Sequence, residues 1–153
     1  MRNIQIPRLY FGKWFRWDNR NSIDGVKYPG VYILTISYRN LAGKSASTGD
    51  AQYIGMTNSQ KGLIGRWYQF HRAIHGHVDG THSGGVAVYK ALGHFDAWDF
   101  DLYVAALPVP CDTASPQPRD YLLMGAVAYL EYKAFAKFLT MRPRLRKPKF
   151  NTR

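Results

Sequence analysis

The spacing of apolar and polar positions changes along the chain, and each change marks a different predicted element. Residues 30–38 are crowded with β-branched and aromatic side chains after a Pro-Gly pair, which predicts a strand. A polar stretch over 39–50 predicts a loop, and a short second strand is predicted over 52–56. These two strands together favour an antiparallel hairpin with a long tip. Alternation of apolar and polar residues over 98–107 predicts a third strand.

Two other segments have the helical period. From Gly62 to about His75, apolar residues recur at spacings of three and four, which predicts a helix. A longer helix is predicted over 119–140. Between them, residues 76–85 are rich in His, Gly and Ser and predict a loop, and the short segment 86–92 is left unassigned. This order predicts an α+β fold with a small central antiparallel or mixed three-stranded sheet flanked by helices.

Composition narrows the class of protein. The chain has 153 residues, 46% of them apolar and 15% aromatic, which excludes a disordered or low-complexity chain. The single cysteine, Cys111, excludes a disulfide framework and any zinc site that needs two thiolates. No stretch has the pattern of an export signal or a membrane span. We therefore expect a cytoplasmic protein with no membrane partner.

The positive charge lies at the two ends of the chain. Of a net +11, residues 1–20 carry five Lys or Arg against one Asp, residues 137–153 carry seven against none, and the body is neutral. This distribution favours basic segments that neutralise the phosphates of a nucleic acid over ends that only keep the protein soluble. We divide the chain into a basic aromatic N-terminal arm, 1–28, and a domain with a basic tail, 29–153.

The N-terminal arm mixes aromatic and cationic side chains over residues 8–17. Such a segment either stacks on nucleic-acid bases or packs its rings on the protein core. Packing is the favoured interpretation, because Trp14 and Trp17 are spaced three apart as on one helical face.

Glu131 is the only glutamate in the chain, and it lies in the middle of the second predicted helix. An ionised carboxylate on an apolar helix face is costly unless a cation meets it. Two interpretations stay open. The carboxylate of Glu131 either forms an ion pair with Arg66 or Arg72, or it is a ligand for a hard divalent cation. Its apolar neighbours three and four positions away are Val127, Ala128, Ala134 and Phe135.

Four histidines fall within twelve residues. His71 and His75 are spaced to share one helical face, but no thiol or acidic ligand accompanies them nearby. A structural zinc site is the less favoured interpretation. Solvated histidines near a phosphate backbone are favoured instead, and the cluster comprises His71, His75, His77 and His82.

Two tripeptides on the predicted hairpin carry a resemblance to a known family. Gly30-Val31-Tyr32 opens the first strand and Tyr53-Ile54-Gly55 lies on the second, and the pair resembles the signature of the GIY-YIG nuclease family. The resemblance extends over roughly 29–151. Residues of the types that the family carries follow in the same order, namely Arg66, Glu131 and Asn151.

The resemblance implies a divalent-metal-dependent endonuclease that hydrolyses phosphodiester bonds in DNA, with RNA as the alternative substrate. Its cofactor would be Mg²⁺, or Mn²⁺ in its place, with Glu131 as the metal ligand. Arg66 would hold the phosphate and Tyr32 would act as the base. Tyr53 would hold the water or the phosphate, and Asn151 would orient the scissile phosphate or the glutamate. A homodimer is expected only if the protein cuts both strands.

The chain departs from the family pattern at two places. Twenty residues separate Tyr32 from Tyr53, more than is usual, which fits a longer hairpin tip. The family often has a His or Tyr four residues after its arginine, where this chain has Phe70. We take His71 as the catalytic counterpart, with Tyr68 as the alternative. The alternative function is a nucleic-acid-binding module that keeps the nuclease fold without catalysis.

Overall fold

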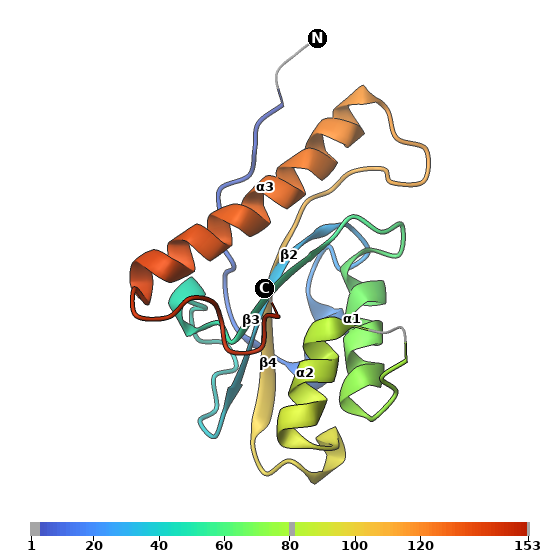
Figure 1. Ribbon diagram of the computed structural model, residues 1–153. Helices are drawn as coiled ribbons and strands as arrows, with labels where there is room; N and C mark the ends of the chain where they lie inside the picture. The colour runs from blue at the N-terminus through green and yellow to red at the C-terminus, as the bar shows by residue number, and fades with distance from the viewer. Residues whose placement is uncertain (1–3, 80–81, 153) are drawn as a thin grey trace.

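The computed structural model describes residues 4–79 and 82–152. The first three residues of the predicted N-terminal arm, residues 80 and 81 of the predicted 76–85 loop, and residue 153 of the tail lie outside the described residues. Within the described part the fold is α+β, as predicted, with one antiparallel sheet between two layers of helices (Figure 1).

The sheet has the strand order β1-β4-β2-β3, and all neighbouring strands are antiparallel. The predicted hairpin is confirmed as β2 (Gly30–Ser37) and β3 (Tyr53–Thr57), and the predicted third strand is β4 (Asp101–Pro108). The prediction of three strands is wrong by one. A two-residue strand, β1 (Phe15–Arg16), pairs with β4 and is too short to have a periodic pattern of its own.

One helix covers one face of the sheet, and two cover the other. The predicted helices are confirmed as α1 (Gly62–Ile74) and α3 (Pro118–Met141). Figure 1 shows α3 along one face, with α1 and α2 (Ser83–Leu92) on the opposite side. Successive residues of β2 point to opposite faces, so the strand contributes to two cores. Val31 packs in the core beneath α3, and Tyr32 packs in the core beneath α1.

The sequence does not predict the start of α2. The sequence predicts a loop over 76–85, but the helix begins at Ser83. The His82 side chain caps the helix, because it accepts hydrogen bonds from the N–H groups of Gly84 and Gly85. Two glycines oppose a helix prediction, since glycine is a poor helix former. Here they are required by packing: a Cβ on Gly84 would lie 2.7 Å from Cζ of Tyr53.

The N-terminal segment packs its rings in the core, as the favoured interpretation predicts, but the expected shared helical face is wrong: β1 separates the two tryptophans, so that Trp14 packs in the core beneath α3 and Trp17 in the core beneath α1. Its backbone also holds the 38–52 connection, since Trp14 N–H donates to the carbonyl of Lys44 at 2.9 Å and the Trp14 carbonyl accepts from Gly43 N–H at 2.9 Å. The segment is therefore part of the folded domain over its described apolar positions. Its buried residues are Leu9, Phe11, Trp14 and Trp17.

The basic tail is irregular but docked on the domain. Arg142 donates from Nε to the carbonyl of Gly49 at 2.8 Å and pairs from Nη2 with Asp50 at 2.9 Å. Phe150 is buried, and its N–H donates to the carbonyl of Gln52 at 2.8 Å. None of the helices described is long and apolar enough to span a membrane.

Two glycine-to-alanine changes test the packing with opposite signs. A Cβ on Gly30 would lie 2.9 Å from Cα of Pro108 on β4, so Gly30→Ala forces two strand backbones apart. We expect it to lower the free energy of unfolding by about 1–3 kcal/mol. Gly125 is exposed within α3 with nothing within 4 Å of its added Cβ, so Gly125→Ala should raise that free energy by about 1 kcal/mol. Urea unfolding of both variants measures this, and equal signs would contradict the assigned close approach.

Candidate active site

Two tyrosine rings, one from β2 and one from the edge strand β3, meet above a glycine of β3. The register of β2 and β3 pairs Tyr32 with Gly55, and Tyr53 lies two residues earlier on the same face of β3. The ring centroids of the tyrosines are 6.0 Å apart. A Cβ on Gly55 would lie 2.6 Å from Oη of Tyr32 and 2.7 Å from Cε1 of Tyr53. Glycine at this position is therefore what allows the two phenols to converge.

Arg66 of α1 acts on both phenols. Burial raises the pKa of Tyr32 well above its usual value, and the nearby Tyr53 adds to this, while the charge of Arg66 and hydrogen bonding to it act in the opposite direction. Burial also raises the pKa of Tyr53, again opposed by Arg66. The guanidinium itself is half-buried and donates from Nη1 to Oε1 of Gln69 at 2.8 Å. It therefore stands between the buried tyrosines and the surface.

The charge of Glu131 reaches Tyr53 from a helix on the other side of the sheet. Glu131 lies on α3, half-buried, and its negative charge raises the pKa of Tyr53. Arg66 and Glu131 come from helices that cover opposite faces, yet both act on Tyr53, which lies on the edge strand. The structure thus brings Tyr32 and Tyr53 together within the electrostatic influence of Arg66, and the charge of Glu131 reaches Tyr53.

A buried histidine completes this cluster. Oη of Tyr32 and Nε2 of His82 are 2.6 Å apart, and both side chains are fully buried. Nδ1 of His82 accepts from the N–H groups of Gly84 at 3.1 Å and Gly85 at 3.3 Å. A neutral imidazole has one N–H, so the proton is on Nε2, which donates to the oxygen of Tyr32. The hydroxyl proton of Tyr32 is consequently directed away from the histidine.

The environment keeps His82 neutral. Burial lowers the pKa of its ring to about 3, and the positive charge of Arg66 contributes. The prediction of a solvated histidine is therefore wrong at this position. Sequence patterns offered little to find it, because His is not a usual helix cap and the Gly-Gly pair after it favours a loop.

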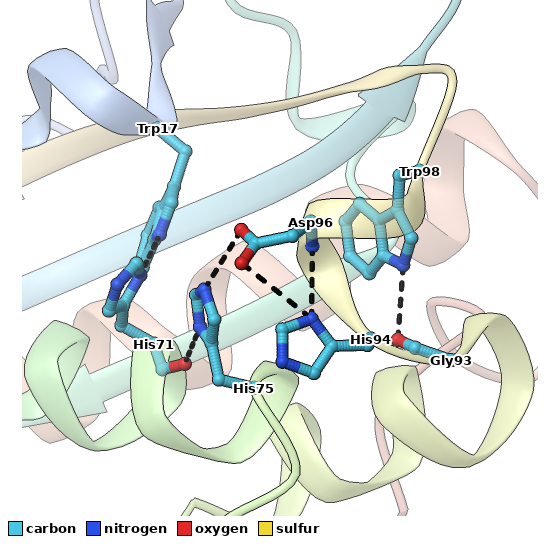
Figure 2. Close-up of polar contacts among 7 residues, drawn as sticks. All are labelled: Trp17, His71, His75, Gly93, His94, Asp96 and Trp98. Atoms are coloured by element: carbon cyan, nitrogen blue, oxygen red, sulfur yellow. Dashed lines mark hydrogen bonds and ion pairs between the residues drawn. The ribbon is translucent and has the colours of Figure 1, made fainter.

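His71 is held in a different cluster. Its Nδ1 accepts from Nε1 of Trp17 at 3.0 Å, and its ring stacks on that indole (Figure 2). Burial, with the positive charge of Arg20 next, lowers the pKa of His71 to about 4. The structure therefore does not bring His71 to the tyrosines, although sequence reasoning placed it there. Helical geometry explains this, since His71 is about 100° further round α1 than Phe70.

The remaining alternative, Tyr68, is exposed on the outer face of α1. The position four residues after Arg66 belongs to Phe70, whose ring packs edge-on against His82 with centroids 5.2 Å apart. A phenylalanine at that position thus supports a histidine from another helix. His82 therefore lies beside Tyr32, where His71 or Tyr68 was expected from the sequence.

Asn151 clamps the edge strand. Its Nδ2 donates to the carbonyl of Ile54 at 2.9 Å, and its Oδ1 accepts from Ile54 N–H at 2.9 Å. Ile54 lies between Tyr53 and Gly55, so this pair of bonds holds the tripeptide in register with β2. Asn151 acts on the site through the position of β3.

The carboxylate of Glu131 fits magnesium better than zinc. Within residues 4–79 and 82–152, no group of three or more His, Cys, Asp or Glu side chains is placed to hold a metal. Structural zinc needs four protein ligands and catalytic zinc three. Magnesium is commonly held by one or two carboxylates, with water and substrate phosphates completing the shell.

Comparison with known proteins found no match: no family model, no curated protein and no solved structure corresponds to this chain.

The buried His82 makes stability depend on pH. Its pKa is about 3 in the fold and about 6.5 when unfolded, so between these values the unfolded chain binds one more proton. Its contribution to stability is complete above pH 6.5 and is lost as the pH falls towards 3. We expect about 1.4 kcal/mol lost per pH unit across this window.

Urea unfolding at several pH values measures this slope. His82→Gln removes the titrating ring and should reduce the slope of the unfolding free energy between pH 6 and pH 4. His71, whose pKa is also lowered, leaves a smaller slope of the same sign. The comparison uses slopes, so a uniform loss of stability in the variant does not affect it. An unchanged slope would show that His82 is protonated without cost.

Proposed function

We propose that this chain is a divalent-metal-dependent endonuclease of the GIY-YIG type, which hydrolyses phosphodiester bonds in DNA at one active site per chain. The observation that carries the proposal is the convergence of Tyr32 and Tyr53 above Gly55, where the charges of Arg66 and Glu131 both act on Tyr53. Phosphodiester hydrolysis needs a cation for the phosphate, a carboxylate for a metal, and a polar group for water. The order of the motifs in the sequence supports the same assignment.

Tyr32 is the proposed base. Its hydroxyl proton points away from His82, and its hydrogen bonding to Tyr53 joins the two phenols, which together would hold a water molecule beside the phosphate. To accept a proton from that water, the phenol must first be ionised. The Nε2–H of His82 and the guanidinium of Arg66 favour the phenolate, because donors and positive charge stabilise the charged form. Tyr53 places a second hydroxyl next to the same position.

Arg66 is the proposed phosphate ligand. Its guanidinium is always protonated, presents two parallel N–H groups to a phosphate, and lies at the exposed side of the tyrosines. Glu131 would hold the metal, which when bound polarises a phosphoryl oxygen and stabilises the leaving group. Asn151 keeps Tyr53 aligned with Tyr32 through β3.

A second candidate is a DNA-binding module without catalysis. One observation favours it, namely that burial raises the pKa of both Tyr32 and Tyr53 in the protein alone. Incubation of supercoiled plasmid with the purified protein separates the two. We expect nicking with Mg²⁺ or Mn²⁺ and none with EDTA, whereas the module would bind the plasmid and leave it supercoiled.

Glu131→Gln tests the metal ligand. The change keeps the shape of the side chain and removes its charge, so nicking should fall by several orders of magnitude, as metal-assisted charge stabilisation is lost. DNA binding in EDTA should be equal or tighter, because a negative charge facing phosphates is gone. Asp24→Asn makes the same chemical change at an exposed position and should leave nicking unchanged. A Glu131→Gln protein that is folded by thermal melting and nicks at the normal rate would refute the assignment.

Arg66→Lys tests the phosphate ligand with the charge kept. An ammonium is a point donor and cannot span two phosphate oxygens, so turnover should fall by at least tenfold. Arg72→Lys, on the exposed face of the same helix, is the matched control and should retain turnover. Single-turnover nicking rates at saturating protein measure both. Equal rates in the two variants would mean that Arg66 has no special role.

A further inference from the structure

The surface of the molecule has a groove that contains none of the residues of the tyrosine cluster. Its volume is about 620 Å³, and it lies between the 38–52 connection, the end of α3 and the tail. Its lining includes the end of β2 and the buried rings of Trp14 and Phe138. Four basic side chains also line it, Arg39, Lys44, Arg142 and Lys149.

The groove carries excess positive charge. Among its lining residues Asp50 is the one carboxylate, and it is paired with Arg142 at 2.9 Å. Within the described residues, Arg39, Lys44 and Lys149 have no carboxylate at ion-pair distance. The groove therefore offers three cations to an anionic ligand.

Backbone contacts hold the walls of the groove. The connection that carries Lys44 is bonded to Trp14 through two backbone hydrogen bonds, and the Arg142 side chain bonds the carbonyl of Gly49. The tail that carries Lys149 is anchored by the buried ring of Phe150. The cations consequently project from ordered backbone, which lowers the entropy that a ligand must remove on binding.

The groove ends at Gln52, next to the start of β3, the strand that carries Tyr53. Gln52 lines the groove and precedes Tyr53 directly. Lys149 lines it as well, two residues before Asn151, which is bonded to Ile54. A chain of phosphates that enters the site can therefore extend past the β3 edge into the groove.

We propose that this groove binds the sugar–phosphate backbone of the DNA strand next to the phosphate that is cleaved. The inference rests on the proposed function for the position of that phosphate. DNA is the occupant that the charges favour, because it presents phosphates at regular intervals, and a strand bound at the candidate active site would bring further phosphates to the three cations. The contacts hold the strand in place and carry no base specificity.

Charge reversal in the groove tests this. Arg39→Glu/Lys44→Glu removes two of the three cations, and Lys90→Glu/Arg119→Glu makes the same change in net charge at exposed positions outside the groove. Binding of a fluorescent DNA duplex is measured in EDTA over a range of salt concentrations. For the groove variant we expect at least tenfold weaker binding than for the control variant. The slope of log affinity against log salt should be smaller by about two.

A second double variant, Arg39→Gln/Lys44→Gln, removes the two charges without reversing them. A thermal melt of each protein shows whether a loss of binding comes from unfolding. Folded groove variants that bind DNA as tightly as the control variant would overturn the inference. So would a wild-type protein that prefers an acidic peptide to the duplex.

Plasmid nicking by the same proteins separates this inference from the proposed function. A selective binding defect in the groove variants, with no nicking by the wild type, would refute the nuclease and keep DNA binding by the groove. Nicking by the wild type with equal binding by both charge-reversed variants would refute the groove alone.

Discussion

The hydroxyl of Tyr32 is a polar group in the middle of the sheet, and its burial constrains the elements around it. A buried hydroxyl without a partner costs about 1–3 kcal/mol, so Oη needs a hydrogen bond. His82 supplies it at 2.6 Å, and His82 is held in turn by two backbone N–H groups of α2. These hydrogen bonds therefore link three features: the start of α2, the neutral state of His82 and the direction of the Tyr32 hydroxyl proton.

The edge of β3 is the second constraint. An exposed strand edge offers unpaired backbone groups, and this chain covers part of that edge with its own tail. Asn151 bonds both backbone groups of Ile54, and Phe150 bonds the carbonyl of Gln52. The tail therefore protects the edge and aligns Tyr53, and the same docking brings its lysines and arginines beside the 38–52 connection.

The site combines buried groups that stay neutral with charged side chains next to them. Burial disfavours charge on Tyr32, Tyr53 and His82, whereas Arg66 and Glu131 place opposite charges at the border of the buried region. Such an arrangement keeps the phenols neutral in the protein alone. A bound phosphate and divalent cation would change that balance, which fits the proposal of a site that acts only when substrate and metal are present.

The α1 and α3 helices and the third strand could be predicted from the sequence because each is long enough to repeat its period. The hairpin could be predicted because β-branched and aromatic residues follow a Pro-Gly pair and a polar stretch separates the two strands. Of the candidate site residues that the sequence offered, Tyr32 and Tyr53 lie together, and the charges of Arg66 and Glu131 act on Tyr53. The position of His71 could not be predicted, because a one-residue step round a helix changes the face, and pattern alone does not fix which face meets the tyrosines.

His82 and α2 depend on contacts between elements far apart in the chain. The groove depends on such contacts too: Arg39 and Lys44 belong to the body of the chain, residues 21–136, which has no net charge, and only folding places them beside the cations of the tail. Local periodicity thus determined the elements, while burial and long-range packing decided which side chains meet.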